Sequence, residues 1–319
     1  MVQADLVLEG GGVKGLGTVG AVLRLLERGY TFPRIAGTSA GAMVAALAAA
    51  GADERQIRGA MGRLELSRAP DRTPPHLPLL SEGLALLTRS GAYEGDYLRD
   101  WVHDELHTLG VETFGDLRRD PDGDDSSLRS DQRYKLVVLA TDITHGRLLR
   151  LPWDYHLFHR EPDEQSVADA VRMSMSIPLY FEPQRLTDPV TGETSVIVDG
   201  AVLSNFAVEI FDRTDGREPR WPTFGVRLLP DLPAGIDQIF PALGVPLPPP
   251  FELLKTVVVT AFVGNDQTHL NRPEVRKRTI TIDSSAVGIT EFDVPDDTVQ
   301  MLVRHGRDAV DEFLADWNE

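Results

Sequence analysis

Residues 37–41, Gly-Thr-Ser-Ala-Gly, place a serine between two glycines at the spacing G-x-S-x-G. A short apolar run precedes them and an alanine-rich stretch follows, which indicates a strand, a sharp turn and a helix. Such a turn exposes the serine hydroxyl, while Gly37 and Gly41 let the neighbouring backbones pass closely. The following helix N-terminus also favours negative charge near Ser39. The pattern predicts a nucleophilic serine, with a plain glycine–serine turn as the alternative.

A second glycine-rich segment, Gly10-Gly11-Gly12-Val13-Lys14-Gly15, also lies between a short apolar run and a helical pattern. In one interpretation, the backbone N–H groups of Gly11, Gly12 and Val13 form an oxyanion hole. In the other, the six residues are a G-x-G-x-x-G dinucleotide fingerprint, which requires an acidic residue about 20 positions further on. Residues 31–38 contain no Asp or Glu, so we favour the oxyanion hole.

The chain offers an acid rather than a histidine as the base for Ser39. None of the eight histidines occurs in a recognisable strand-end motif. By contrast, the apolar run at 196–198 ends in Asp199, and Gly200 then begins a turn. The carboxyl ends of strands in an α/β sheet converge on one crevice, so we expect Ser39 and Asp199 to meet there. A simple Asp-Gly turn is the alternative interpretation.

Together and in order, these segments resemble the patatin-like phospholipase family over about residues 5–208. Residues 9–15 are similar to the glycine-rich oxyanion loop of that family, and residues 37–41 to its nucleophile turn. Asp199-Gly200-Ala201, followed by Asn205, is similar to its catalytic acid motif. Further similar segments are Tyr93-Glu94-Gly95 with Leu98 and Trp101, Thr113 to Leu117, Ala140-Thr141-Asp142, Asp169 to Ser174, Ser176-Ile177-Pro178, and Phe292-Asp293 with the last helix.

The resemblance implies a Ser-Asp dyad, with Ser39 as nucleophile and Asp199 as base. It also implies oxyanion donors at Gly11, Gly12 and Val13. The supporting motif positions would be Gly10, Lys14, Gly15, Gly37, Gly41 and Gly200. The departures from the family pattern, at Lys14, Ala201 and Ala207, remove no catalytic group. Lys14 either contacts a lipid phosphate or is a solvated lysine at the helix start, and we favour the second interpretation.

The predicted function is that of a lipid acyl hydrolase, a phospholipase A or lysophospholipase-like serine esterase that uses no cofactor and no metal. Its substrate would be a fatty-acyl ester or phospholipid, with transient contact at a membrane surface. Two alternatives keep the acyl chemistry, namely an acyltransferase or a thioesterase on the same fold. Two others do not: a nucleotide-binding protein that uses Gly10 to Gly15, and a catalytically silent binding module.

The elements that must position these residues alternate between strands and helices. Further strands are predicted at 135–140, 223–229 and 279–282, and helices at 98–109 and 299–317. The pattern favours an α/β fold, a three-layer α/β/α sandwich with a mostly parallel central sheet. We expect a single domain over 1–319, with a core at 5–208 that 209–319 completes. Apolar loops at 66–92 and 229–250 are either a lid and acyl-chain wall or a simple cover of the core.

Composition narrows the functional class further. The chain has 319 residues, a net charge of −17 and no cysteine. The absence of cysteine excludes disulfides, thiolate metal sites and a cysteine nucleophile. The negative charge disfavours nucleic acid and charge-driven adsorption to anionic lipid. No signal peptide is visible, and the apolar stretch at 40–50 is too short to span a bilayer. We therefore expect a cytoplasmic protein, peripheral at membranes when it meets its substrate.

Overall fold

The computed structural model describes residues 2–71, 90–119, 132–229, 253, 256–258, 260–261 and 272–317. Most of the two predicted lid loops, at 72–89 and 230–250, lies outside the described residues. The strands are β1 (Val2–Gln3), β2 (Asp5–Leu8), β3 (Tyr30–Thr31), β4 (Ile35–Thr38), β5 (Gly91–Tyr93), β6 (Leu136–Asp142), β7 (Arg147–Leu151), β8 (Leu179–Phe181), β9 (Gln184–Thr187), β10 (Thr194–Asp199), β11 (Thr223–Leu229) and β12 (Thr279–Asp283). The α-helices are α1 (Leu16–Glu27), α2 (Ala40–Ala49), α3 (Glu54–Arg63), α5 (Asp96–Thr108), α6 (Val167–Ser174), α9 (Pro273–Arg276) and α10 (Asp296–Asp316).

Eight strands form the central sheet, in the order β12-β11-β2-β4-β6-β10-β9, with β7 paired to β6. The run from β12 to β6 is parallel, whereas β10, β9 and β7 are each antiparallel to their neighbours. Every residue of β2, β4 and β6 is buried, as expected for parallel strands covered on both faces. The predicted α/β sandwich with a mostly parallel sheet is thereby confirmed.

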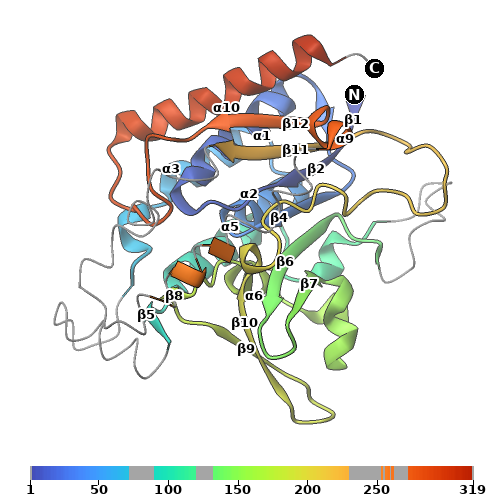
Figure 1. The fold of residues 1–319 in the computed structure, drawn as a ribbon, viewed down its shortest axis with the longest axis vertical. Coiled ribbons are helices and arrows are strands. Elements are labelled where there is room, and N and C mark those ends of the chain that lie inside the picture. The colour runs from blue at the N-terminus through green and yellow to red at the C-terminus, as the bar shows by residue number, and fades with distance from the viewer. Residues whose placement is uncertain are drawn as a thin grey trace.

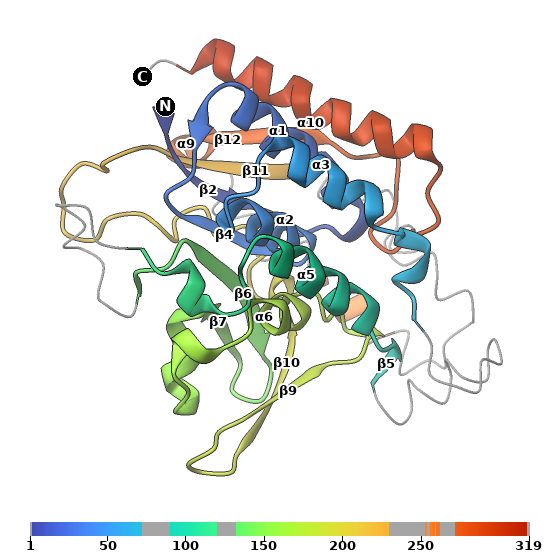
Figure 2. The ribbon, with the colours of Figure 1, turned by 180° about the vertical axis from the view of Figure 1, so that it is seen from behind.

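Helix α2 lies at the centre of the helical layer that Figure 2 shows together with α3, α5 and α6. It is buried on almost every side, and it consists mainly of alanine. Small side chains allow close packing against β4 on one side and against α5 and α6 on the other. Since α2 begins directly after Ser39, this packing holds the Ser39 turn against the sheet.

Strands β4 and β10 lie on the same edge of β6 and run toward each other. The opposite edge is occupied by β7, which pairs with β6 from Val138 to Asp142. Along the shared edge, Thr38 lies opposite Leu139 and Asp199 lies opposite Ala140. The two strand ends therefore meet head to head. We expected Ser39 and Asp199 to meet because both follow the carboxyl ends of parallel strands. That reason is wrong, because β10 is antiparallel to β6.

The carboxyl-terminal part of the chain extends the same sheet. Strand β11 pairs with β2, and β12 pairs with β11. Helix α10 lies along this end of the sheet, beside α1 (Figure 1). The two helices approach closely at glycines, since a Cβ at Gly20 would collide with the Val303 carbonyl and one at Gly306 with the Gly17 carbonyl. Among the helices of the described residues, none has the length and apolarity needed to cross a membrane.

We expect Gly306→Ala to destabilise the fold by about 1–3 kcal/mol, because the added methyl group meets a backbone carbonyl that cannot rotate away. The control is Gly62→Ala in α3, where the new Cβ would have open space. That change should stabilise by about 0.5–1 kcal/mol, since glycine weakens a helix. Urea unfolding measures both. Changes of the same sign in the free energy of unfolding of the two variants would contradict close packing of α1 on α10.

Candidate active site

Ser39 lies in a strained turn between β4 and α2. Its φ of 52° and ψ of −127° are unusual for a residue with a side chain, and only 3% of the residue is exposed. The Ser39 N–H donates to Ser174 Oγ at 2.8 Å, and its carbonyl accepts from the Ala42 N–H at 2.9 Å. Neighbouring groups therefore hold the serine in a conformation that the isolated chain would avoid.

The two glycines around the serine are required by close backbone contacts. A Cβ at Gly41 would lie 2.6 Å from the Leu8 carbonyl oxygen. A Cβ at Gly37 would lie 2.6 Å from the Ala42 nitrogen. Backbone atoms cannot move aside as flexible side chains do. Glycine at 41 therefore lets the turn pack against the end of β2, and glycine at 37 lets the turn close on the start of α2.

Asp199 ends β10 with no exposed surface. Its Oδ1 accepts the Ala201 N–H at 2.9 Å, whereas Oδ2 makes no hydrogen bond of regular geometry with the part of the chain that the structure describes. Complete burial raises the pKa of the carboxyl to about 7, although the Ala201 N–H and the Ser39 hydroxyl both favour the charged form. The structure thus brings Asp199 and Ser39 together. Gly200 follows without room for a side chain, since a Cβ there would lie 2.5 Å from the Leu139 carbonyl.

The glycine loop after β2 lies beside the serine, since a Cβ at Gly10 would be only 2.9 Å from Ser39 Cβ. The N–H groups of Gly11 and Gly12 have no acceptor among the described residues. The Val13 N–H, however, donates to the Ile289 carbonyl at 3.0 Å. Of the three predicted oxyanion donors, the Val13 amide is therefore already hydrogen-bonded to a distant segment in this structure.

Asn205 and Glu9 hold the glycine loop in place. The Gly10 N–H donates to Asn205 Oδ1 at 3.1 Å, and Asn205 Nδ2 donates to the Gly10 carbonyl at 3.0 Å. The same Nδ2 donates to Glu9 Oε1 at 3.3 Å, and Glu9 Oε2 accepts the Leu228 N–H at 2.5 Å. The loop is thereby connected to the turn after Asp199 and to β11. Sequence reasoning placed Asn205 and Glu9 in motifs without assigning them this role.

Lys14 is buried, with 8% of its surface exposed, so the prediction of a solvated lysine is wrong. The Ser285 backbone and side chain lower the pKa of the Asp283 carboxyl, and the Lys14 charge adds to this effect. The Lys14 charge therefore acts on the carboxyl-terminal end of β12. Gly15 follows it, and a Cβ there would lie 2.7 Å from Ala40 Cβ, so the two glycine-containing turns pack together.

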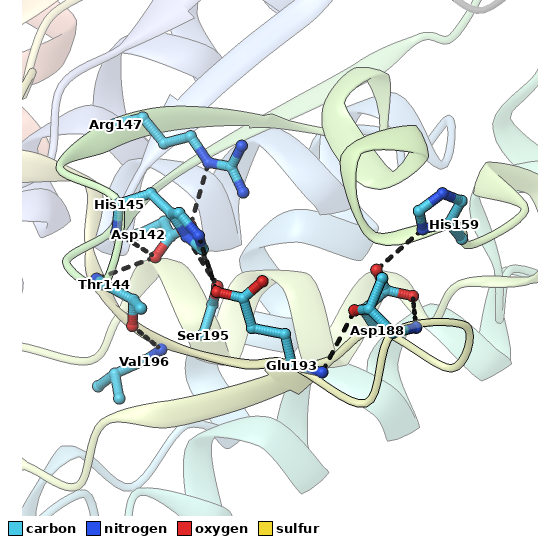
Figure 3. Close-up of polar contacts among 10 residues, drawn as sticks. Asp142, Thr144, His145, Arg147, His159, Asp188, Glu193, Ser195 and Val196 are labelled. Atoms are coloured by element: carbon cyan, nitrogen blue, oxygen red, sulfur yellow. Dashed lines mark hydrogen bonds and ion pairs between the residues drawn. The ribbon is translucent and has the colours of Figure 1, made fainter.

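A serine also contacts a histidine, at the turn between β6 and β7 (Figure 3). His145 Nδ1 lies 2.8 Å from Asp142 Oδ2 and 3.2 Å from Ser195 Oγ. The other ring nitrogen, Nε2, faces Glu193 Oε1 at 3.1 Å. A Ser-His-acid relay requires the serine to donate its proton to the ring. Here the Ser195 hydroxyl donates to Asp142 Oδ2 at 3.2 Å. Figure 3 shows the His145 ring in this cluster, and no contact joins it to Ser39 among the described residues.

The described residues contain no group of three His, Asp or Glu side chains that could hold a metal ion.

The hydrogen bonds of the glycine loop do not favour the dinucleotide interpretation. The Gly10 and Val13 N–H groups are already used by Asn205 and Ile289. Fewer amides therefore remain for a pyrophosphate than the fingerprint would supply.

Comparisons with known proteins identify the family and the fold. The Patatin-like phospholipase family model matches residues 6–212. The uncharacterized protein YqhO of Bacillus subtilis (strain 168) is 34% identical over 315 residues, which is 98% of either chain. VipD from Legionella pneumophila has a TM-score of 0.52 at 19% identity, over 98% of this chain and 66% of that chain. The ExoU–SpcU complex from the type III secretion system of Pseudomonas aeruginosa gives 0.52 at 20% identity, over 98% and 51%. The chain thus spans only part of these two solved proteins, and they establish the fold alone.

The raised pKa predicts that Asp199→Asn stabilises the folded chain at alkaline pH. The pKa of Asp199 is about 7 when folded and about 3.9 when unfolded, so wild-type stability falls as pH rises between these values. We expect the variant to be more stable than wild type by roughly 2–4 kcal/mol at pH 8, and by much less near pH 4.

Urea unfolding at both pH values measures this difference. The control is Asp116→Asn, because the N–H groups of Thr113 and Glu112 lower the pKa of the Asp116 carboxyl. That variant should be less stable than wild type at pH 8. Equal stability of wild type and Asp199→Asn at pH 8 would contradict the raised pKa of the buried Asp199 carboxyl.

Proposed function

The chain belongs to the patatin-like phospholipase family, and we propose that it hydrolyses fatty-acyl esters of lipids with Ser39 as nucleophile and Asp199 as base. The observation that carries the proposal is the fully buried Asp199 carboxyl, with a pKa of about 7, next to the strained serine. Strained backbone and a strongly shifted pKa in contact with each other are typical of functional sites.

The pKa of Asp199 suits the task of a base at neutral pH. An ordinary aspartate, with a pKa of about 3.9, accepts a proton from a hydroxyl poorly. At a pKa of about 7, half of the molecules carry the charged base at neutral pH, and the driving force for proton transfer is greater. General-base assistance of this kind contributes about 10²–10⁴-fold to the rate.

The proposed reaction has two halves. As Ser39 Oγ attacks the ester carbonyl carbon, its proton passes to Asp199, and the carbonyl oxygen becomes an oxyanion. Collapse of the tetrahedral intermediate breaks the ester C–O bond, and the leaving alcohol takes the proton from Asp199. Water then attacks the acyl-Ser39 ester and gives a proton to Asp199. The second collapse returns that proton to Ser39 and releases the fatty acid.

The oxyanion donors in this proposal are the N–H groups of Gly11 and Gly12. The contact of the preceding residue, Gly10, with Ser39 and the lack of an acceptor for the two N–H groups among the described residues support the assignment. One well-aimed amide contributes about 2.7–4 kcal/mol to the transition state, so the pair is comparable in importance to the base. Asn205 and Glu9 would hold the loop in the orientation that aims these amides.

Family membership supports a phospholipid or lysophospholipid as the substrate class. The acyl-Ser39 intermediate is common to hydrolysis and to acyl transfer, and water as acceptor makes the enzyme a hydrolase. Contact with a lipid surface follows from the proposed substrate. No cofactor enters the mechanism, because the hydroxyl, the carboxyl and the amides supply each proton transfer and the charge stabilisation.

We expect Ser39→Ala to abolish turnover of a lysophospholipid and to prevent labelling by an alkyl fluorophosphonate. Asp199→Asn should lower kcat by about 10²–10⁴-fold, because the base is lost. Peptide mapping of the labelled wild type should find the adduct at Ser39. The matched control is Ser195→Ala, a buried serine beside His145. Labelling that disappears in the control but persists in Ser39→Ala would contradict the proposal.

The pH dependence of kcat/KM should follow ionisation of Asp199. We expect the rate with an uncharged ester to rise tenfold per pH unit at acid pH, to be half-maximal near pH 7, and to level off above it. His145→Gln serves as the control and should leave the midpoint unchanged. A midpoint near pH 4, or one that moves in the His145 variant, would contradict Asp199 as the base.

A further inference from the structure

We propose that Ser174, at the end of α6, is a positioning residue that aligns the Ser39 hydroxyl with Asp199. The inference rests on the proposed function, since it concerns the same two side chains. Neither the family match nor the glycine motifs assign a role to this hydroxyl. The contacts around it lead to the proposal step by step.

The Ser174 hydroxyl is inserted between two backbone groups at the end of a β-ladder. Its Oγ donates to the Leu139 carbonyl at 2.6 Å and accepts the Ser39 N–H at 2.8 Å. Leu139 is the residue of β6 that lies opposite Thr38, the last residue of β4. The hydroxyl therefore provides a hydrogen-bond partner for a backbone group of β6 and for the residue that follows β4. It does so at the point where the chain leaves the sheet to form the Ser39 turn.

The same end of α6 also holds the other member of the dyad. The Asp199 N–H donates to the Ser176 carbonyl at 2.9 Å. Two residues of one short segment, Ser174 and Ser176, thus bind the backbone N–H groups of Ser39 and Asp199. The distance between the hydroxyl and the carboxyl consequently depends on a single element that contacts both backbones.

Arg172 makes this end of α6 rigid. Its Nη1 donates to Ser176 Oγ at 2.8 Å, and Ser176 Oγ donates in turn to the Arg172 carbonyl at 3.0 Å. Nη2 donates to the Glu182 carbonyl at 3.0 Å and also to the Glu94 carbonyl. Arg172 is 2% exposed, so these bonds are formed away from competing water. The segment that carries Ser174 is therefore fixed to two other parts of the fold.

Strain at Ser39 explains why the hydroxyl matters for chemistry. A residue with φ of 52° and ψ of −127° keeps that conformation only when its surroundings over-determine it. The side chain of Ser174 is the acceptor for its N–H. Without that acceptor, the N–H would be buried and unpaired, and rotation of the turn would relieve the strain. A misplacement of about 1 Å at a reacting atom lowers rates by about 100-fold.

The test compares Ser174→Ala with Ser166→Ala in the full chain. Ser166 caps the opposite end of α6, where its Oγ accepts the Asp169 N–H at 3.1 Å. Both variants lose a serine hydroxyl that binds a backbone N–H, so both should lower Tm. We expect only Ser174→Ala to lower kcat, by about 10–100-fold with KM unchanged, and to slow fluorophosphonate labelling in proportion. Ser174→Thr restores the hydroxyl and should recover most of the lost kcat.

Hydrogen exchange gives a readout that does not depend on activity. The peptide that contains Ser39 should exchange faster in Ser174→Ala than in Ser166→Ala. Full kcat in Ser174→Ala, or equal losses of kcat in the two alanine variants, would overturn the positioning role while leaving the proposed function intact. A wild type that neither hydrolyses esters nor is labelled at Ser39 would overturn the proposed function, and the positioning role with it.

Discussion

Complete burial of the Asp199 carboxyl beside Ser39 is the constraint on which the rest of the site depends. Removal from water raises its pKa to about 7. Within the part of the chain that the structure describes, the Ala201 N–H makes a regular hydrogen bond to the carboxyl, and the Ser39 hydroxyl adds to this offset. The charged form therefore costs folding stability above neutral pH. A carboxyl that is poorly solvated in this way is also a stronger base than an exposed one, so the same feature that weakens the fold supports the proposed chemistry.

The sheet makes this contact through an unusual arrangement of strands. Because β4 and β10 share one edge of β6 and run toward each other, their last residues meet near Leu139 and Ala140. The β-ladder ends at that point, and the chain on either side must turn away. The hydroxyl of Ser174 and the carbonyl of Ser176 take over the hydrogen bonds there. The strained turn thus lies at the point where two strands on one edge of β6 both end.

The glycine loop depends on parts of the chain that are distant in sequence. Leu228 binds Glu9, and Ile289 binds Val13, yet both lie beyond residues 6–212, which the family model matches. The strands β11 and β12 bring these residues beside β2. The carboxyl-terminal third therefore does more than complete the sheet, since it determines which amides of the loop remain available.

Local patterns in the sequence were sufficient for the α/β class, the serine turn, the glycine loop and the acid after an apolar strand. Apolar runs, glycines and helix stops act over a few residues, so the sequence carries them directly. It could not determine the direction of β10, the burial of Lys14 or the hydrogen bond that the Val13 N–H donates. Each of these depends on a partner far along the chain. Val13 and Ile289, for example, form a hydrogen bond although they are far apart in the sequence. Only the tertiary structure decided them, because hydrogen bonding and desolvation depend on which surfaces the folded chain brings together.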